Sequence, residues 1–355
     1  MAGTRPRTPE SVARARMVTL GLWRPRAKDP KGVVGRLVAI QAQEHAYARW
    51  SVGQRCNAPA SVVDAAFDAG EVVRTHVLRP TWHYANPADL RWLLELTGRR
   101  LDAVNARRYD ELDLDARTLR RATDVIADVV AAGPATRGEL ADELQRRRIS
   151  PGGQRLPHLL FHTELQMVVC SGPMRGKEHT YMSFDDRVPA GPTFTEEEAL
   201  AELARRWFTT RGPASIRDFR WWSGLPAAQA LAALGAAASE LSSYEQDGRT
   251  YWFAESPRPP KGPRVDLVQC YDETIISYTE TRDVLATAAV SFPVPRSLDG
   301  FTHVLLCDGR LAGHWRVQRL RGGVEVETRL ARAFEARERA ALDAAVARYE
   351  EFVRT

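Results

Sequence analysis

Two segments far apart in this sequence begin in nearly the same way, and this echo limits the folds that the chain can adopt. Gly133-Pro134-Ala135-Thr136-Arg137 is followed 79 residues later by Gly212-Pro213-Ala214-Ser215-Ile216-Arg217. In each segment a Thr or Ser stands directly before residues with helical periodicity, which is the pattern of a helix N-cap. The echo covers only five or six positions, so it supports a tandem duplication without proving it.

The same order of elements surrounds both segments and occurs once more near the N-terminus. Several predicted helices are followed by a short hairpin, which is the order of a winged helix-turn-helix. The first hairpin is predicted at 72–76 and 81–85, around Arg79-Pro80, the second within 167–184, and the third within 244–254, turned at Asp247-Gly248. The predicted helices lie at about 9–21, 30–41, 44–55, 59–69, 87–108, 119–131, 137–147, 155–166, 195–208 and 225–241.

The composition changes at 256–264, where four prolines alternate with Arg258, Lys261 and Arg264. This composition indicates a stiff basic linker. Beyond it, strands are predicted at 265–270, 303–307, 311–317 and 324–328, with a helix at 331–354. We therefore expect an α+β protein, with three tandem winged helix-turn-helix units at 1–110, 111–192 and 193–256. A small C-terminal β-barrel with a terminal helix follows at 257–355.

The composition also excludes several classes of protein. With 355 residues and 44% hydrophobic content, the chain can bury a large core, and it holds neither a run of eighteen apolar residues nor an apolar signal region. We expect a cytoplasmic protein with no membrane partner. The four cysteines are far apart and form no CxxC pair, which argues against a zinc cluster or disulfides. His158 and His162 have metal-ligand spacing but no third ligand, so we expect neither a metal nor a cofactor.

Basic residues are concentrated at the N-terminal end. Residues 1–56 hold eleven Arg or Lys against three Asp or Glu, whereas the whole chain has a net charge of +5. Such a basic segment suggests nucleic acid as the partner. Forty-six of the fifty basic residues are Arg, which either codon bias in a GC-rich genome or selection for Arg chemistry would explain. The four Lys residues leave few amines to form a Schiff base.

The tripeptide Gln41-Ala42-Gln43 lies within this basic segment. Amides cannot act as a general base near neutral pH, but each offers a donor and an acceptor that can hold one water in a fixed position. The preceding run at 33–40 is apolar enough to be a buried helix that brings the amides to a cleft. Residues two apart in a helix point to nearly opposite sides, so we expect the motif where this helix ends or breaks. An ordinary solvated helix face is the alternative.

Together with four other features, this tripeptide resembles the pattern of the AlkZ and YcaQ winged-helix DNA glycosylases. The other features are the basic first helix, the stretch from Val73 to His83, Tyr271-Asp272-Glu273, and the stretch from Asp308-Gly309 to Gly313-His314-Trp315-Arg316. The resemblance spans about Val12 to Tyr349. It implies three winged-helix units and a β-barrel around a DNA channel. It also implies an enzyme that removes bulky N-alkylated purines, including crosslinked and toxin-modified guanines, from double-stranded DNA.

The family's catalytic signature, which is a Gln, an apolar residue and then Gln or Asp, falls on Gln41, Ala42 and Gln43. An N7-alkylated guanine is already cationic, so its glycosidic bond breaks without prior protonation, and the enzyme needs only to stabilise a sugar cation and place water. We expect Gln43 to position the water and Gln41 to orient the water or the deoxyribose. The four lysines predict a monofunctional reaction, and we expect a monomer because no heptad pattern indicates a dimer. The resemblance implies base excision repair, with the enzyme associated with the nucleoid. Its role would be DNA repair or self-resistance to a genotoxic natural product.

Further candidate residues have alternative interpretations. Glu44 is either a base or a solvated carboxylate in the first turn of a helix, and His83 either reaches the lesion or packs within its hairpin. Asp272 and Arg282 recur in the resemblance, with a functional or structural role left open, and Trp221-Trp222 is expected in the core. The candidate lesion or DNA contacts are His83, Arg79, Thr81 and Arg49, and the candidate DNA-backbone contacts are Arg36, Arg258, Lys261 and Arg264.

Two rival interpretations remain. The first is a non-catalytic winged-helix regulator or architectural protein, since winged helices mostly bind DNA without chemistry. Three units in one chain, with the most distinctive motif outside the usual recognition helix, argue against it, and no heptad pattern indicates the dimer that a regulator would form. The second is a family member that has lost its activity.

Overall fold

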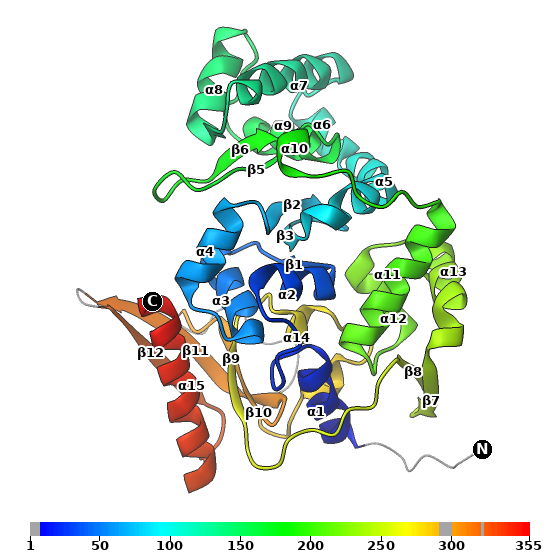
Figure 1. The fold of residues 1–355 in the computed structure, drawn as a ribbon, viewed down its shortest axis with the longest axis vertical. Helices are drawn as coiled ribbons and strands as arrows, with labels where there is room; N and C mark the ends of the chain where they lie inside the picture. Colours follow the sequence, from blue (N-terminus) through cyan, green and yellow to red (C-terminus); the bar gives the residue numbers. More distant parts are fainter. Residues whose placement is uncertain (1–7, 291–299, 321–322) are drawn as a thin grey trace. The chain divides into compact units, whose positions relative to one another are not determined.

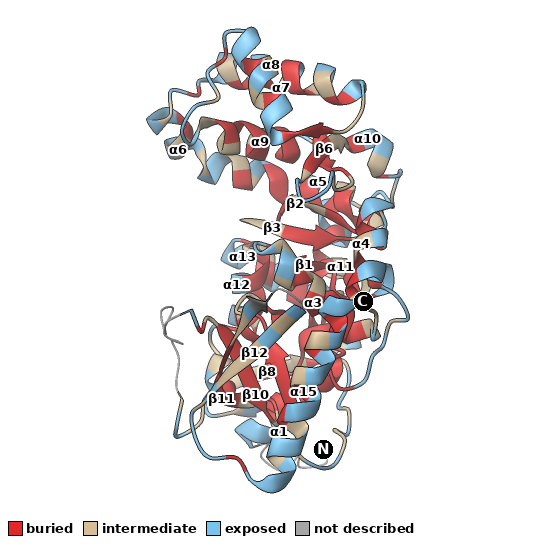
Figure 2. Cartoon of the chain, turned by 90° about the vertical axis from the view of Figure 1, so that its left-hand side faces the viewer, coloured by how far each residue is buried: buried red, intermediate tan, exposed pale blue. Residues whose placement is uncertain are grey.

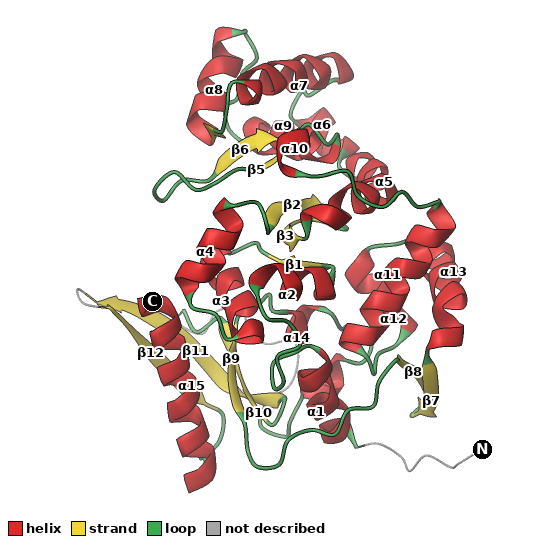
Figure 3. Ribbon diagram, in the orientation of Figure 1, coloured by secondary structure: helices red, strands yellow, loops and turns green. Residues whose placement is uncertain are grey.

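The computed structural model describes residues 8–290, 300–320 and 323–355 (Figure 1). By its internal contacts the chain divides into two compact units, which we call unit 1 (Met1–Asp64 and Leu200–Thr355) and unit 2 (Ala65–Ala199). Both units combine helices with strands (Figure 3), which confirms a mixed helix and sheet fold. The predicted division into four domains, with boundaries at 110, 192 and 256, stays a prediction.

The N-terminal helices of unit 1 begin where the sequence places capping residues. Helix α1 (Pro9–Thr19) follows Thr8, whose side chain accepts a hydrogen bond from the Ser11 N–H at 3.2 Å. Helix α2 (Pro30–Leu37) follows Asp29, which accepts from the Gly32 N–H at 2.7 Å. Proline suits the first turn of each helix because its missing N–H needs no partner there. The helices that follow in unit 1 are α3 (His45–Cys56), α12 (Ile216–Ser223), α13 (Ala227–Ala237) and the 3₁₀ turn η1 (Ala238–Glu240). Two more helices, α4 (Ala60–Asp68) and α11 (Glu196–Arg211), each span a boundary between the two units.

A four-stranded antiparallel sheet forms an open half-barrel in unit 1, with the order β12-β11-β10-β9. Its strands are β9 (Val265–Val268), β10 (His303–Cys307), β11 (Arg310–Leu320) and β12 (Gly323–Leu330). Residues of α1 join the sheet in one apolar core, in which Met17 lies with Leu306 and Leu311. Helix α15 (Ala336–Arg354) buries Leu342, Ala345, Tyr349 and Phe352 and exposes most of its other residues (Figure 2). These findings confirm the predicted C-terminal sheet and its helix.

Two short elements between β9 and β10 were not expected from the sequence. They are α14 (Glu273–Ile276) and the 3₁₀ turn η2 (Arg282–Leu285). The side chain of Asp272 caps α14 by accepting from the Thr274 N–H at 2.9 Å. A helix of four residues is too short to show a hydrophobic period, and therefore the pattern could not predict it. Helix α15 begins at Ala336 rather than at the predicted 331, because Glu335 and Glu338 form a capping box there.

Unit 2 contains the first predicted hairpin and a second, three-stranded sheet. Strands β2 (Val73–Val77) and β3 (Arg79–Ala85) are antiparallel. The bend falls at Leu78, which has φ 65°, so Arg79 and Pro80 belong to β3 and not to the turn as predicted. The other sheet has the order β4-β6-β5, formed by β4 (Ala135–Thr136), β5 (Val169–Ser171) and β6 (Thr180–Ser183).

The two echoed segments both begin helices, as predicted. In unit 2, Thr136 and Glu139 form a capping box at the start of α8 (Arg137–Arg146), and in unit 1, Ser215 and Asp218 form one at the start of α12. The helix predicted at 87–108 is divided at Asn105 into α5 (Pro87–Val104) and α6 (Ala106–Glu111). The helices of unit 2 are α5 (Pro87–Val104), α6 (Ala106–Glu111), α7 (Ala116–Ala131), α8 (Arg137–Arg146), α9 (Arg155–Leu165) and α10 (Phe184–Arg187).

All three predicted hairpins form. They are β2 with β3, β5 with β6, and β7 (Ser242–Gln246) with β8 (Arg249–Phe253). The last hairpin turns at Asp247-Gly248, where both residues have positive φ, 51° and 71°, as a tight two-residue turn requires. The grouping of these hairpins and helices into three winged-helix units stays a prediction.

Candidate active site

The helix predicted at 30–41 ends early, at Leu37, and the Gln pair lies beyond it. Val38 has φ 67° and ψ −56°, close to the dihedrals of a strained γ-turn and costly for a β-branched residue. The chain continues as the short strand β1 (Ala39–Gln41) and enters α3 at His45. The motif therefore follows the end of the helix, as the geometric argument required, but Gln41 lies on a strand and not on the helix.

Gln41 and Gln43 differ in their exposure to solvent. Gln41 is only 5% exposed, Ala42 is fully buried, and Gln43 is exposed. Gln41 ends β1 and Gln43 lies in a bend. The helical geometry that would turn the two side chains to nearly opposite sides therefore does not apply to them. One amide of the pair is thus held within the protein while the other faces solvent.

Glu273, the first residue of α14, fixes the main chain of the motif. Its carboxylate is fully buried, and Oε1 accepts a hydrogen bond from the Gln41 N–H at 3.1 Å. Oε2 accepts from Arg211 Nη2 at 2.7 Å, from Trp222 Nε1 at 2.8 Å and from Ser277 Oγ at 2.8 Å. A buried ionised carboxylate is tolerated only when it is paired and hydrogen-bonded, and Glu273 meets both conditions.

Arg211, the last residue of α11, holds the bend that precedes the motif. Its Nη1 donates to the Leu37 carbonyl and its Nη2 to the Ala39 carbonyl, both at 3.1 Å. These carbonyls stand on either side of Val38. The guanidinium is fully buried and lies 4.4 Å from the centroid of the Trp222 ring, a favourable cation–π distance. One side chain therefore binds both flanks of the strained turn.

Asp272 forms a second buried ion pair, one residue earlier. Arg55 Nη2 donates to Oδ1 at 2.7 Å, and Ser51 Oγ donates to Oδ2 at 2.6 Å. Burial opposes ionisation, but the charge of Arg55 and the hydrogen bonds from Arg55, Ser51 and the Thr274 main chain outweigh it and lower the pKa of Asp272. Arg55 Nε also donates to the Leu20 carbonyl at 3.0 Å. Asp272 therefore links α3 to α14, and the alternative of a functional role stays open.

Arg282 also binds main chain close to its own position. Its Nε donates to the Tyr278 carbonyl at 2.7 Å, and burial lowers the pKa of its guanidinium. This contact is local and structural, and the alternative of a functional role for Arg282 stays open.

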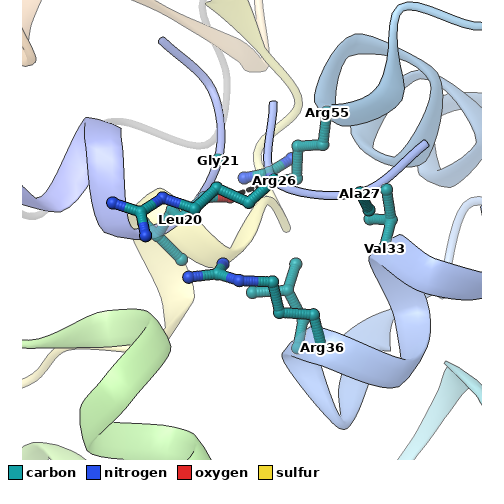
Figure 4. Close-up of a pocket in the computed structure, with 8 residues that line it drawn as sticks. Leu20, Gly21, Arg26, Ala27, Val33, Arg36 and Arg55 are labelled. Carbon is teal, nitrogen blue, oxygen red and sulfur yellow. Dashed lines mark hydrogen bonds between the residues drawn. The ribbon is translucent and has the colours of Figure 1, made fainter. Parts of the chain in front are cut away.

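Arg36 is half-buried and donates from Nη1 to the Thr19 carbonyl at 2.7 Å. It lines a small cavity with Arg26 and Arg55, and Figure 4 shows Arg26 and Arg36 extending in the same direction. The cavity has about 10 Å³ of water-accessible space, room for about one water molecule and too little for a phosphate group. Burial and the nearby charge of Arg26 lower the pKa of Arg36 to about 10, so it stays charged at neutral pH. Its contact with the DNA backbone stays a prediction.

Two other candidates belong to α3 or its N-terminus. Arg49 is half-buried and forms an ion pair with Asp64 of α4. Glu44 precedes the helix and is exposed, yet neighbouring atoms remove part of its hydration and raise the pKa of its carboxyl. Because a raised pKa suits a general base or acid, the alternative role of Glu44 stays open. A contact of Arg49 with the lesion stays a prediction.

The remaining lesion-contact candidates lie on β3 of unit 2, whereas the Gln pair belongs to unit 1. His83 is fully buried, and its Nδ1 lies 2.8 Å from the Thr81 carbonyl. Its Nε2 lies 3.5 Å from Nη2 of Arg79. Arg79 and Thr81 are themselves half-buried. This burial favours a packing role for His83, and a DNA contact by any of the three residues stays a prediction.

The predicted linker at 256–264 contains neither helix nor strand. Arg258 and Lys261 are exposed, and Arg264 is half-buried, with its guanidinium 5.9 Å from the centroid of the Trp23 ring. Because Arg258 and Lys261 are already exposed, their side chains can reach a phosphate without a rearrangement of the protein. The three basic residues of the linker therefore stay candidates for contacts with the DNA backbone.

Sequence reasoning placed Trp221 and Trp222 together in the core, and this is wrong for one of them. Trp222 is fully buried, but Trp221 is 50% exposed. With Arg217 and Arg220 it lines an open hollow of about 530 Å³. An exposed aromatic ring beside guanidinium groups is a platform on which nucleic acids bind. Arg217, Arg220 and Trp221 are spaced at i, i+3 and i+4, which places them on one face of a helix. This spacing is the sequence pattern from which the surface could have been predicted.

The other predictions concern groups away from the motif. In the described part of the chain, no group of three or more His, Cys, Asp or Glu side chains is placed to hold a metal ion. His158 and His162 contact Asn105 and Asp102, each at 2.9 Å.

All four cysteines are free thiols. None of the described helices is long and apolar enough to cross a membrane. Arg5 and Arg7 of the basic N-terminal segment lie outside the described residues.

Comparison with known proteins places the chain in a family. It matches the family described as DNA glycosylase AlkZ-like over residues 34–352. Its structure is similar to that of the DNA glycosylase AlkZ of Streptomyces sahachiroi, with a TM-score of 0.74 and 20% sequence identity over 99% of this chain and 98% of that chain. At this identity the similarity shows the fold. No curated protein matches the sequence. Because the family match covers most of its length, this protein belongs to the AlkZ-like family of DNA glycosylases.

Proposed function

We propose that this DNA glycosylase hydrolyses the N-glycosidic bond of bulky N7-alkylated purines in double-stranded DNA, such as toxin adducts of guanine and interstrand crosslinks. The observation that carries the proposal is the pair of neutral amides outside a helix, with Gln43 exposed and the Gln41 main chain bound to a buried carboxylate. Neutral amides suit a cationic base because such a base leaves without being protonated. The enzyme must only place water and stabilise the sugar cation.

The two amides have different roles in this proposal. The exposed Gln43 holds the attacking water, and the nearly buried Gln41 orients the water or the deoxyribose. Each amide offers both a donor and an acceptor, so two amides can fix a water without taking its proton. The reaction is monofunctional, because the chain holds only four lysines and no amine is assigned to attack the sugar.

DNA binding in this proposal is largely electrostatic. Arg36, Arg258, Lys261 and Arg264 contact the backbone, and Arg49, Arg79, Thr81 and His83 lie nearer the lesion. The hollow at Trp221 adds a stacking surface, which supports a nucleic-acid interface on unit 1. The protein acts as a monomer on the nucleoid, in DNA repair or in self-resistance to a genotoxic natural product.

The test is excision from a duplex that carries a single N7-alkylguanine, under single-turnover conditions. We expect an abasic site, with no strand break until alkali is added, and no protein–DNA adduct trapped by borohydride. A duplex with a neutral damaged base, such as 8-oxoguanine, is the control and should stay intact, because its glycosidic bond is not activated by charge. Absence of excision from every N7-alkylguanine duplex would contradict the substrate class, and a trapped adduct would contradict the monofunctional reaction.

A further inference from the structure

The bend before the Gln motif is strained and lies inside the protein. Val38 is fully buried and has φ 67° and ψ −56°. A β-branched residue rarely adopts positive φ, because its side chain then crowds the backbone. Such a conformation persists only where surrounding groups hold it. Those groups must act on the main chain on either side of Val38.

Arg211 supplies contacts on both sides. It donates to the Leu37 and Ala39 carbonyls, each at 3.1 Å. Glu273 in turn fixes the guanidinium, because its Oε2 accepts from Nη2 at 2.7 Å and from Nε at 3.1 Å. The other oxygen of Glu273 accepts from the Gln41 N–H at 3.1 Å. The pair therefore contacts the main chain at three positions from Leu37 to Gln41.

We propose that Arg211 and Glu273 are positioning residues for the Gln motif. Together they hold the bend at Val38 and the Gln41 main chain, so that the Gln41 and Gln43 amides meet the reacting sugar in a fixed geometry. This inference rests on the proposed function, in which the amides place the water. Both side chains of the pair are fully buried, so they act through the motif and do not touch DNA.

The chemistry of the pair supports a geometric role. A guanidinium has five N–H donors in one rigid plane and can bind two carbonyls and a carboxylate at once, which a lysine or a neutral side chain cannot do. A buried ion pair stabilises a protein little more than apolar residues of similar volume do. What the pair supplies beyond apolar packing is therefore the placement of the main chain, and this contribution can be separated from folding.

The first test replaces the whole pair, with Arg211→Met and Glu273→Leu in one variant. We expect a folded protein whose affinity for the duplex changes by less than about 2-fold, because no DNA contact is removed. Single-turnover excision from the N7-alkylguanine duplex should fall about 100-fold, since a displacement of about 1 Å in a reacting group has that effect. The matched control is Arg16→Met. Arg16 is also a fully buried arginine of unit 1, but it donates to the Pro213 and Thr281 carbonyls, at 2.9 and 3.0 Å, and its loss should leave excision by the folded protein within about 3-fold.

A second measurement separates positioning from general support of the core. Glycine adopts positive φ without steric cost, so adding Val38→Gly to the double variant should restore the bend in part and raise its excision rate at least about 5-fold. A pair that only stabilised the core would gain nothing from this change. If the double variant does not fold, Arg211→Lys takes its place, because lysine keeps the charge but cannot bind both carbonyls. DNA affinity and the single-turnover excision rate are then measured for this variant in the same way.

The outcomes distinguish this inference from the proposed function. Gln43→Ala is measured in the same assay. If Gln43→Ala is slow while the folded double variant excises within about 3-fold of the wild-type rate, the positioning role is wrong and the proposed function stands. A double variant that loses DNA affinity rather than rate also overturns the positioning role. If Gln43→Ala excises as fast as the wild type, the proposed function fails and the inference fails with it.

Discussion

The interiors of the two units differ in how they accommodate charged side chains. Unit 1 buries Arg16, Arg55 and Arg211, each at most 2% exposed, whereas unit 2 buries none of its arginines. In unit 2 the buried ionisable pair is His76 with Glu164, whose Nδ1 and Oε2 lie 2.6 Å apart. One unit thus has arginines in its core, and the other has an interior closer to that of an ordinary apolar domain.

The difference between the units is related to their buried main-chain carbonyls and to the groups that donate hydrogen bonds to them. Buried carbonyls need donors, and in unit 2 arginines that keep contact with solvent supply some of them, as the half-buried Arg100 does by donating from Nη2 to the Leu78 carbonyl at 2.8 Å. In unit 1 several such carbonyls belong to buried residues at helix ends and turns, among them Leu20, Leu37 and Thr281. The buried arginines supply the donors from distant parts of the chain. The distant carbonyls that they bind are those of Leu20, Leu37, Ala39, Pro213 and Thr281, and Arg55 also binds the Ser51 carbonyl of its own helix.

The largest expected effect on stability comes from breaking a buried pair of unit 1. Asp272→Asn removes the charge that compensates Arg55, and both groups are at most 2% exposed. An uncompensated buried guanidinium costs about 3–5 kcal/mol of the free energy of unfolding. Urea unfolding at pH 7, followed by circular dichroism, measures this loss.

The control for this prediction is a surface pair of unit 2. Arg107→Ala breaks an ion pair with Glu111 on a helix surface, where Arg107 is 92% exposed. Solvent and mobile ions screen such a pair, so the unfolding midpoint should not move measurably. If Asp272→Asn shifts the midpoint no more than Arg107→Ala does, the buried arginines of unit 1 do not have the role assigned to them.

The next effect concerns the reaction and also compares the units. Gln43→Ala should lower single-turnover excision about 100-fold, or about 2.7 kcal/mol, with DNA affinity nearly intact, because the amide acts mainly in the transition state. Gln41→Ala should act in the same direction, and the double variant should lose less than the sum, since both amides act on one water and one sugar. His158→Ala in unit 2, which has no place in the proposed DNA contacts, should leave the rate within about 3-fold of that of the wild type. Equal losses for Gln43 and His158 would show that the chemistry is not confined to unit 1.

Gln43→Asp tests more closely whether the side chain at position 43 holds the attacking water. It introduces the family's other signature and adds a carboxylate that can accept a proton and stabilise the sugar cation. Activity should survive in part and fall below about pH 5, as the new Asp protonates. The wild type has no titrating group at this position, so a pH–rate profile that is the same for both proteins would remove Gln43 from the reaction.

The features that could be predicted from the sequence are those with local causes. Thr8, Asp29 and Thr136 indicated helix starts because a cap forms within a few residues. The Gln pair was recognised from the chemistry of its side chains, and its position after a helix followed from the helical period. Each of these inferences uses a window of a few residues, and helices do begin directly after Thr8, Asp29 and Thr136.

The features that could not be predicted depend on distant residues or on backbone strain. Arg211 and Glu273 are 62 positions apart, and no pattern in the sequence joins them. Val38 gives no sign of a positive φ, because β-branched residues are typical of the opposite backbone region. Trp221 and Trp222 are neighbours with the same side chain, so only the helix face decides which one is buried. The candidate site was therefore found at the motif but not at the groups that hold it.

A smaller effect, on pH dependence, involves one buried histidine of unit 1. Burial lowers the pKa of His303 to about 4 from its usual 6.5, and its Nδ1 accepts from the Cys270 N–H at 3.3 Å, an interaction that protonation would remove. Between those two pKa values the unfolded chain binds a proton that the folded chain does not. Stability should therefore fall as the pH is lowered, by roughly 2 kcal/mol from pH 7 to pH 5. In His303→Gln this part of the pH dependence should disappear from urea unfolding curves.

The counterpart in unit 2 is His179, whose pKa burial and the charge of Arg74 also lower to about 4. This side chain is half-buried rather than buried, so solvent screens part of the effect and His179→Gln should flatten the pH dependence less than His303→Gln does. Equal flattening would mean that the two interiors penalise a protonated histidine alike, although only one of them buries arginines.

The smallest expected effect is on DNA affinity and concerns the basic linker of unit 1. Replacing Arg258, Lys261 and Arg264 with Gln should lower the slope of log affinity against log salt by roughly one unit for each phosphate that the protein no longer neutralises. The control in unit 2 replaces Arg146 and Arg147, which both pair with Glu143. Because that carboxylate already offsets part of their charge, their removal should change the slope less. Titrations of undamaged duplex at several salt concentrations measure both slopes, and a linker variant with the wild-type slope would show that these three cations lie outside the DNA footprint.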